Sequence, residues 1–111
     1  MNDLPQRRER FLRDGRDRRL GNIASNLLRL SGWLQAGRDP QATVDLIQET
    51  AAMIEWTGDD ATEELVDVQR ELCRWRRIWP LEPARSLLAF RARQMSDRVL
   101  ELSGLTASAP R

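Results

Sequence analysis

Four stretches of this chain repeat apolar residues at alternating spacings of three and four, and Gly or Pro separates each stretch from the next. This spacing places the apolar side chains on one face of an α-helix, so each stretch predicts an amphipathic helix. In the fourth of these stretches, Leu87 and Phe90 are expected to widen the apolar face. The four apolar stripes are Leu20, Ile23, Leu27, Leu30 and Leu34; Val44, Ile47, Ala51 and Ile54; Ala61, Leu65, Val68, Leu72, Trp75 and Trp79; and Ala84, Leu88, Ala92, Met95, Val99 and Leu102.

The boundaries of these helices coincide with residues that start or stop helices. Gly37 suits the left-handed position just past a helix end, and Asp39 followed by Pro40 is typical of a cap and a first turn. Gly58 and Pro80 end the next two helices in the same way. The expected helices cover about residues 17–36, 39–57, 60–79 and 82–104.

Short connections favour antiparallel neighbours, so these helices predict an all-α fold, an up-down antiparallel bundle of about four helices. We expect the bundle domain to cover residues 17–104. An Arg-rich N-terminal lead at 1–16, partly helical or mobile, precedes it, and a frayed tail at 105–111 follows it. A three-helix core with one swapped or dimer-forming helix is the alternative. The length of 111 residues suits a single domain.

The composition excludes much catalytic chemistry. The chain has no Lys, His or Tyr, and Cys73 is its only cysteine. It therefore lacks an imidazole base, a His-ligated metal, a Schiff-base lysine and an internal disulfide. We expect no catalytic, cofactor-binding or metal-binding residue, a protein that is not an enzyme, and a buried Cys73 thiol.

The net charge of +1 hides a block pattern. Residues 1–20 carry seven Arg and four acidic residues, and residues 73–98 carry seven Arg and two acidic residues. Between them, residues 39–72 carry ten acidic residues and one Arg. Blocks of opposite sign attract one another, either within one molecule or between two.

Two arginine-rich segments are candidates for binding a partner. The N-terminal run either forms a nucleic-acid-binding arm or folds against the acidic middle of the chain. The segment 73–80 interleaves Arg with Trp, which suits stacking on bases, although its tryptophans also continue the core stripe. The candidate partner-binding residues are Arg7, Arg8, Arg10, Arg13, Trp33, Arg74, Arg76, Arg77 and Trp79.

The first expected helix also carries a stripe of small residues, with Gly21, Ser25 and Gly32 at helical spacing. Gly inside a helix costs about 1 kcal/mol relative to Ala, so two glycines on one face favour the close approach of another helix. That helix belongs either to the same chain or to a second copy. These residues are therefore a candidate helix-packing or dimer face.

These observations favour a non-enzymatic protein–protein interaction or adaptor module that binds another protein and itself as a homodimer. The alternative is an arginine-mediated nucleic-acid-binding protein. No apolar stretch approaches the ~20 residues of a membrane-spanning helix, so no membrane partner is expected. The lone cysteine and the absence of an apolar leader predict a cytoplasmic location.

Four segments of the chain resemble a known group of sequences. They are Glu-Arg-Phe-Leu at 9–12, Arg-Leu-Gly-Asn-Ile-Ala-Ser-Asn-Leu at 19–27, Ile-Glu-Trp-Thr at 54–57 and Arg-Val-Leu-Glu-Leu-Ser-Gly-Leu at 98–105. Together they resemble a group of small, functionally uncharacterised all-helical proteins of photosynthetic bacteria, chiefly cyanobacteria. The resemblance implies a bacterial cytoplasmic setting and brings no activity, cofactor or site residue.

Overall fold

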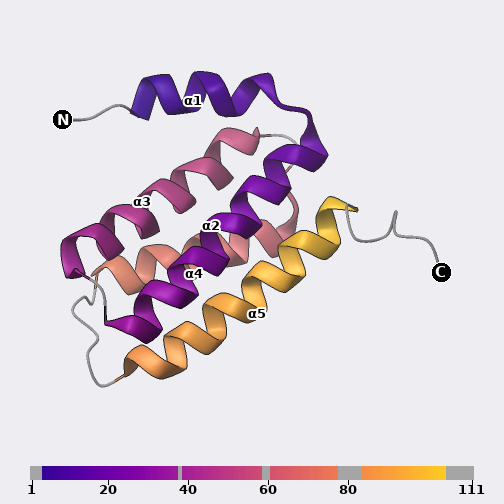
Figure 1. The fold of residues 1–111 in the computed structure, drawn as a ribbon. Coiled ribbons are helices and arrows are strands. Elements are labelled where there is room, and N and C mark those ends of the chain that lie inside the picture. The colour runs from indigo at the N-terminus through magenta and orange to yellow at the C-terminus, as the bar shows by residue number, and fades with distance from the viewer. Residues whose placement is uncertain (1–3, 38, 59–60, 78–83, 105–111) are drawn as a thin grey trace.

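The computed structural model describes residues 4–37, 39–58, 61–77 and 84–104, which form five α-helices and no strand (Figure 1). The helices α2 to α5 are the four expected from the sequence, and the all-α bundle is confirmed. The Arg-rich lead contributes one more helix, α1, and the tail 105–111 lies outside the described residues. The helices are α1 Leu4–Arg13, α2 Arg16–Ala36, α3 Pro40–Thr57, α4 Glu63–Arg77 and α5 Arg85–Ser103.

The helices α2 to α5 run alternately up and down, as short connections require. Helix α2 packs against both α3 and α5, and α3 packs against α4. Helix α1 lies across the α2–α3 side of this bundle (Figure 1). All the helices therefore belong to one packed unit.

Local residues explain where the helices begin and end. Gly37 has a positive φ of 67° just past α2, which confirms its expected role. The Asp39 carboxylate accepts a hydrogen bond from the Gln41 amide at 3.2 Å and caps α3. At the start of α4 the Thr62 hydroxyl accepts a hydrogen bond from the Leu65 amide at 3.3 Å. The chain thus reverses where the sequence predicts it.

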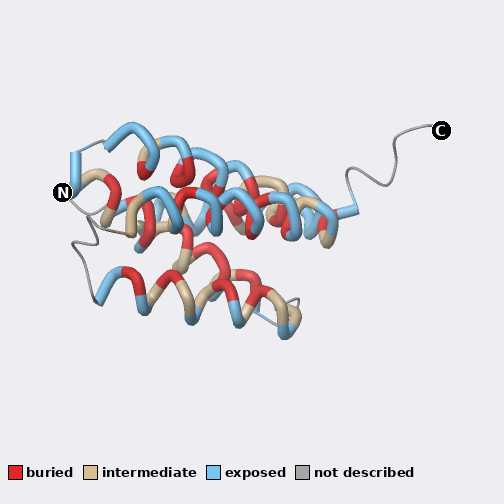
Figure 2. Tube along the Cα trace, turned by 90° about the horizontal axis from the view of Figure 1, so that it is seen from below, coloured by how far each residue is buried: buried red, intermediate tan, exposed pale blue. Residues whose placement is uncertain are grey.

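The core is built from the apolar stripes, and the buried positions lie on the sides of the helices that face one another (Figure 2). In α3 the buried face is rotated from the expected one, since Val44 and Ala51 are only half-buried. Three threonines are buried instead, Thr43, Thr50 and Thr57, and each hydroxyl donates to the carbonyl four residues earlier. These internal hydrogen bonds satisfy the hydroxyls and so permit their burial.

Small residues line the contact between α2 and α5. Ala24 on α2 and Ala89 and Ala92 on α5 are all buried. The Ser31 hydroxyl donates to the Ala89 carbonyl, and the Ser96 hydroxyl donates to the Ala24 carbonyl, each at 2.7 Å. Two reciprocal bonds from side chain to backbone require the helix backbones to lie close together, and they fix the antiparallel register of the pair.

Ion pairs connect α5 to α4 on the other side of the bundle. The Arg91 guanidinium donates to both carboxylate oxygens of Glu71, at 2.8 and 3.0 Å. Arg98 binds both oxygens of Glu64 in the same forked geometry. The hydrogen bond from Arg98 lowers the pKa of Glu64, and the bond to Glu71 raises the pKa of Arg91. These pairs close the ring of helices.

The small-residue contact predicts that Ala92→Leu is destabilising. Ala92 is fully buried against α2, so the larger side chain forces the helices apart and costs about 1–3 kcal/mol of unfolding free energy. Ala36→Leu is the matched control, because Ala36 is exposed. The measurement is urea unfolding followed by circular dichroism. Equal midpoints for the two variants contradict the prediction.

The Glu64–Arg98 pair predicts a defined pH dependence of stability. Because the pKa of Glu64 is lowered from its ordinary value of 4.5, its contribution is present above pH 4.5 and is lost as the pH falls below it. Glu64→Gln is therefore expected to lower the melting temperature more at pH 7 than at pH 3. Glu63→Gln, at the exposed neighbour, serves as the control. A Glu64→Gln deficit that is equal at the two pH values contradicts this assignment.

Candidate partner-binding groove

Helix α1 is held on the bundle by one aromatic contact and one ion pair. Phe11 is 5% exposed, and its ring centroid lies 5.8 Å from that of Trp56 with the planes tilted by 56°. Nearer the start of α1, the Arg7 guanidinium pairs with the Glu49 carboxylate. Arg7 precedes Phe11 in α1, and their partners Glu49 and Trp56 follow the same order in α3. The two helices therefore run side by side and parallel.

The C-terminal end of α1 is tied to α2. The Arg19 side chain donates to the carbonyl oxygens of Asp14 at 2.7 Å and Leu12 at 3.3 Å. The Asn22 amide donates to the Asp14 carboxylate at 3.2 Å. Carbonyls at a helix end have no partner within the helix, so these bonds both stabilise α1 and fix the turn that joins it to α2.

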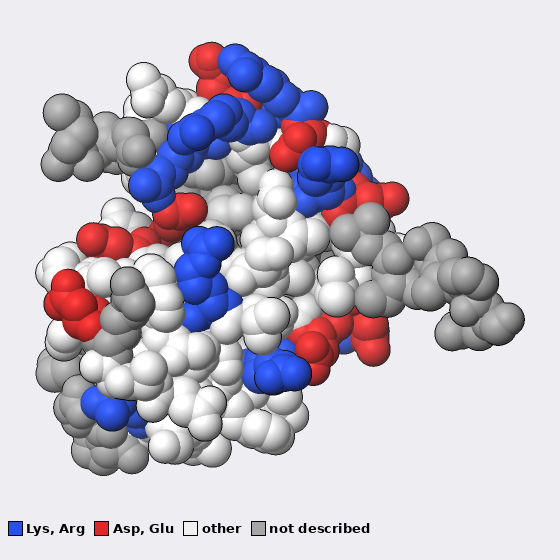
Figure 3. Space-filling model, in the orientation of Figure 1, with Lys and Arg blue, Asp and Glu red and all other residues white. Residues whose placement is uncertain are grey.

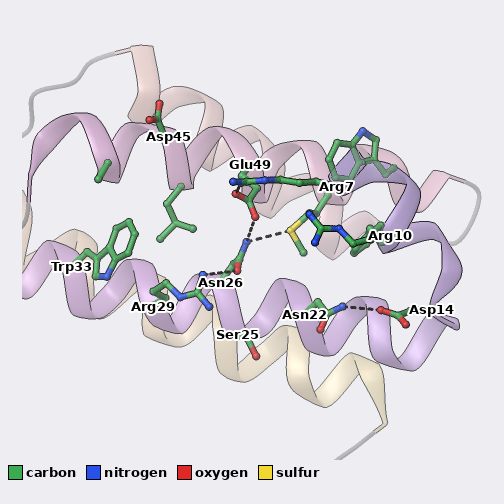
Figure 4. A pocket seen from close by; sticks show the side chains of 15 residues that line it. Arg7, Arg10, Asp14, Asn22, Ser25, Asn26, Arg29, Trp33, Asp45 and Glu49 are labelled. Atoms are coloured by element: carbon green, nitrogen blue, oxygen red, sulfur yellow. Dashed lines mark hydrogen bonds and ion pairs between the residues drawn. The ribbon is translucent and has the colours of Figure 1, made fainter. Parts of the chain in front are cut away.

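An open groove of about 840 Å³ lies between α1, α2 and α3 (Figure 4). Ligand pockets in proteins commonly have volumes of about 300–1,000 Å³. Both apolar and charged side chains line this groove. The apolar and aromatic lining residues are Phe11, Trp33, Ala42, Leu46, Met53 and Trp56, and the charged ones are Arg7, Arg10, Asp14, Arg29, Asp45 and Glu49.

Asn26 lies at the middle of the groove and is only 6% exposed. Its amide nitrogen donates to Glu49 Oε2 at 3.4 Å and to the Met53 sulfur at 3.2 Å. Its carbonyl oxygen accepts a bond of 3.5 Å from Arg29. Sulfur is a weak acceptor and the other two bonds are long, so this buried amide is only weakly satisfied.

The structure brings together some of the candidate partner-binding residues and separates others. Arg7, Arg10 and Trp33 line the groove, and Ser25 lies at its edge. The Arg7–Glu49 pair confirms that the N-terminal run folds against the acidic middle of the same chain. Figure 3 shows the arginines of α1 along one edge of the molecule. Exposed residues outside the groove are Arg8, Arg13, Arg74, Arg76 and Arg77.

The expected Trp–Arg surface is only partly present. Trp75 is buried in the core, as its place in the apolar stripe predicted. Trp79 lies outside the described residues. The arginines at the C-terminal end of α4 therefore flank a core tryptophan and do not line the groove that contains Trp33.

The small-residue stripe of α2 faces outward. Gly32 is exposed, and a Cβ added there meets nothing within 4 Å, so the alternative that a helix of the same chain packs on it is wrong at this position. Ser25 is also exposed, and Gly21 is half-buried. Helix α5 packs on the neighbouring stripe of α2, which carries Ala24 and Ser31. A second copy on the outer stripe stays a prediction.

The exposed large apolar side chains of the described residues all belong to α2 and α5. They are Leu28 at 48%, Leu87 at 69% and Phe90 at 61% exposure. The expectation that Leu87 and Phe90 widen the core face of α5 is therefore wrong. The buried face of α5 consists of Ala89, Ala92, Met95, Ser96, Val99 and Ser103, and Leu87 and Phe90 lie outside it. Figure 3 shows broad uncharged surface where these two helices lie.

Cys73 and the acidic side chains are the remaining chemistry-bearing groups among the described residues. Cys73 is half-buried, rather than buried, and lines a cavity of about 190 Å³ between α3 and α4. Within the described ranges, no cluster of three acidic or cysteine side chains has the arrangement of a metal site. None of the helices described is both long enough and apolar enough to span a membrane.

The sequence reasoning missed several residues of the groove, chiefly Asn26, Arg29 and Met53. The sequence contains one signal for Asn26. This residue is next to Leu27, on the inner side of the first apolar stripe, and a buried polar side chain there requires a hydrogen-bonding partner. The partner, Glu49, lies on a different helix, so its identity required the packed structure.

No family model, no curated protein and no solved structure matches this chain.

The contacts of α1 predict that Phe11→Ala releases this helix from the bundle. Phe11 is the only residue of α1 that is buried, so its truncation removes most of the apolar contact with α3. Tryptic cleavage after Arg7, Arg8 and Arg10 is expected to accelerate while α2 to α5 stay helical. Phe90→Ala is the matched control, since Phe90 is exposed. Unchanged cleavage in Phe11→Ala contradicts the docking role of this ring.

Proposed function

We propose that this protein is a non-enzymatic interaction module that binds another protein and forms a homodimer. The observation that carries the proposal is the exposed apolar face of α2 and α5, with Leu28, Leu87 and Phe90. Exposed large apolar side chains are typical of an interaction surface, because their burial on association removes apolar area from water.

The charges on this face favour a second copy as the occupant. Arg93 and Asp97 follow Phe90 along the same outward stripe of α5, and neither has an ion-pair partner among the described residues. In an antiparallel contact of α5 with α5 about a two-fold axis, each Arg93 meets Asp97 of the second copy. The face is thus complementary to itself in charge as well as apolar.

The small residues of α2 add room for close contact. Gly32 has open space where a side chain would lie, and it shares a stripe with Ser25 and Leu28. Small residues let a neighbouring helix approach the backbone. The missing Lys and His residues support a role in binding rather than catalysis, and the single Cys73 supports a cytoplasmic setting as part of the proposal.

Arginine-mediated nucleic-acid binding is the second candidate function. The observation that favours it is the exposure of Arg8, Arg10 and Arg18 along α1 and the start of α2. Acidic residues are interleaved with these arginines, which weakens their attraction for phosphates. A gel-shift assay with random RNA and DNA at ~0.15 M salt decides the matter, because screening then acts over about 8 Å. The absence of a shift removes this candidate.

The dimer proposal predicts the mass of the protein in solution. Sedimentation equilibrium is expected to give twice the chain mass of 12.8 kDa for the wild-type protein, in equilibrium with the monomer on dilution. Phe90→Glu is expected to give the monomer mass, because the contact then requires the burial of two like charges. Gln48→Glu, on the exposed face of α3, adds the same charge elsewhere and is expected to leave the dimer intact.

A charge exchange tests the geometry of the contact. Arg93→Asp and Asp97→Arg each place like charges opposite one another in the proposed dimer and are expected to weaken it. The double exchange restores opposite charges and is expected to recover dimerisation. A wild-type protein that is monomeric at every concentration overturns the dimer. If the double variant dimerises no more strongly than the single variants, the α5–α5 contact is overturned.

A further inference from the structure

The charged residues of the α1–α2–α3 groove are unequally satisfied. All three carboxylates have partners: Asp14 accepts from Asn22, Asp45 accepts from Gln41 at 3.0 Å, and Glu49 pairs with Arg7. The other two lining arginines, Arg10 and Arg29, have no acidic partner among the described residues. Asn22 and Gln41 are neutral donors, so among the described residues only the Arg7–Glu49 pair neutralises charge in the groove, and the Arg10 and Arg29 guanidinium groups can take an acidic ligand.

These two arginines flank the same point. Arg10 comes from α1 and Arg29 from α2, and Figure 4 shows their guanidinium groups on the two sides of Asn26. Among the described residues, Arg29 donates one hydrogen bond, of 3.5 Å, to the side-chain oxygen of Asn26. A carboxylate between two arginines accepts forked, charge-assisted hydrogen bonds, which are stronger than bonds between neutral groups. The arrangement suits an anionic group placed above Asn26.

Apolar surface lies beside this anion position. Trp33 lies at the end of the groove that is next to Arg29 (Figure 4), and Ala42 and Leu46 also line the groove. Trp33 is half-buried, so part of its ring faces the groove. An aliphatic or aromatic side chain can pack there while an acidic neighbour in the same segment reaches the arginines. The lining thus matches a ligand with one negative charge next to one apolar group.

We propose that this groove binds a short acidic peptide segment of a partner protein. A Glu or Asp side chain of the segment lies between Arg10 and Arg29, and an adjacent Phe or Leu packs on Trp33. This site specifies the chemistry of the partner that the proposed interaction module binds. It rests on the proposed function in one respect, namely that the ligand is part of a protein. A peptide is favoured over nucleic acid because Asp14, Asp45 and Glu49 line the same groove and repel a polyanion.

The test uses a set of fluorescently labelled hexapeptides that each contain one Glu next to one Phe, with this pair at a different position in each peptide. Matched peptides have Gln in place of Glu. Fluorescence polarisation with the full-length protein is expected to find a Glu peptide with a Kd below about 1 mM that binds at least tenfold tighter than its Gln match. Arg10→Gln and Arg29→Gln are each expected to weaken this binding by about tenfold or more.

Arg18→Gln is the matched control, because Arg18 is exposed and lies outside the groove, and it is expected to leave the affinity unchanged. Circular dichroism confirms that each variant is folded. Equal binding of the Glu and Gln peptides, no binding by any Glu peptide, or an equal loss in Arg18→Gln overturns the proposal. Displacement of the peptide by random-sequence RNA at lower concentration than by unlabelled peptide overturns the choice of a peptide.

The outcomes also separate this site from the proposed dimer. Phe90→Glu is expected to keep peptide affinity, because Phe90 lies outside the groove. A wild-type protein that dimerises but binds no Glu peptide overturns the groove assignment alone. Tight binding of a Glu peptide by a monomeric protein supports the groove and leaves the dimer overturned.

Discussion

The close contact between α2 and α5 is the constraint on which the rest of this structure depends. Two serine hydroxyls reach across it to opposing carbonyls, and Ala24, Ala89 and Ala92 are buried beside them. The two bonds fix which side of α5 faces α2, so that Leu87 and Phe90 lie on the surface. The same packing that stabilises the bundle therefore creates the apolar face proposed for dimerisation.

The contact with α5 also determines how α2 meets the other helices. With one face against α5 and its leucines in the core, α2 turns a third, polar face with Asn22, Asn26 and Arg29 toward α1 and α3. Polar side chains cannot close this seam by apolar packing, and α1 contacts α3 chiefly through Phe11 and Arg7. The groove is the space that this incomplete closure leaves.

The fold was largely predictable from the sequence, because apolar periodicity and the glycines and prolines at helix ends are local signals. Helix α2 was expected from residue 17 and begins at Arg16, and Gly37 ends it as expected. The buried face of α3 was not predictable from apolar residues alone, since Thr43, Thr50 and Thr57 are buried through their own backbone bonds. The docking of α1 depends on a contact between residues 11 and 56, which no local pattern encodes.

The candidate site was predictable only in part, for the same reason. The arginines of the lead and Trp33 were each singled out by composition, but their meeting in one groove follows from the parallel placement of α1 along α3.

Every basic side chain is Arg, which stays protonated at any physiological pH, so pH acts on the ion pairs between α4 and α5 through their carboxylates. The lowered pKa of Glu64 keeps its pair with Arg98 ionised across the neutral range, where this exposed pair responds to salt. Binding at the proposed groove depends on competition between the acidic groups of a partner and those of the chain itself.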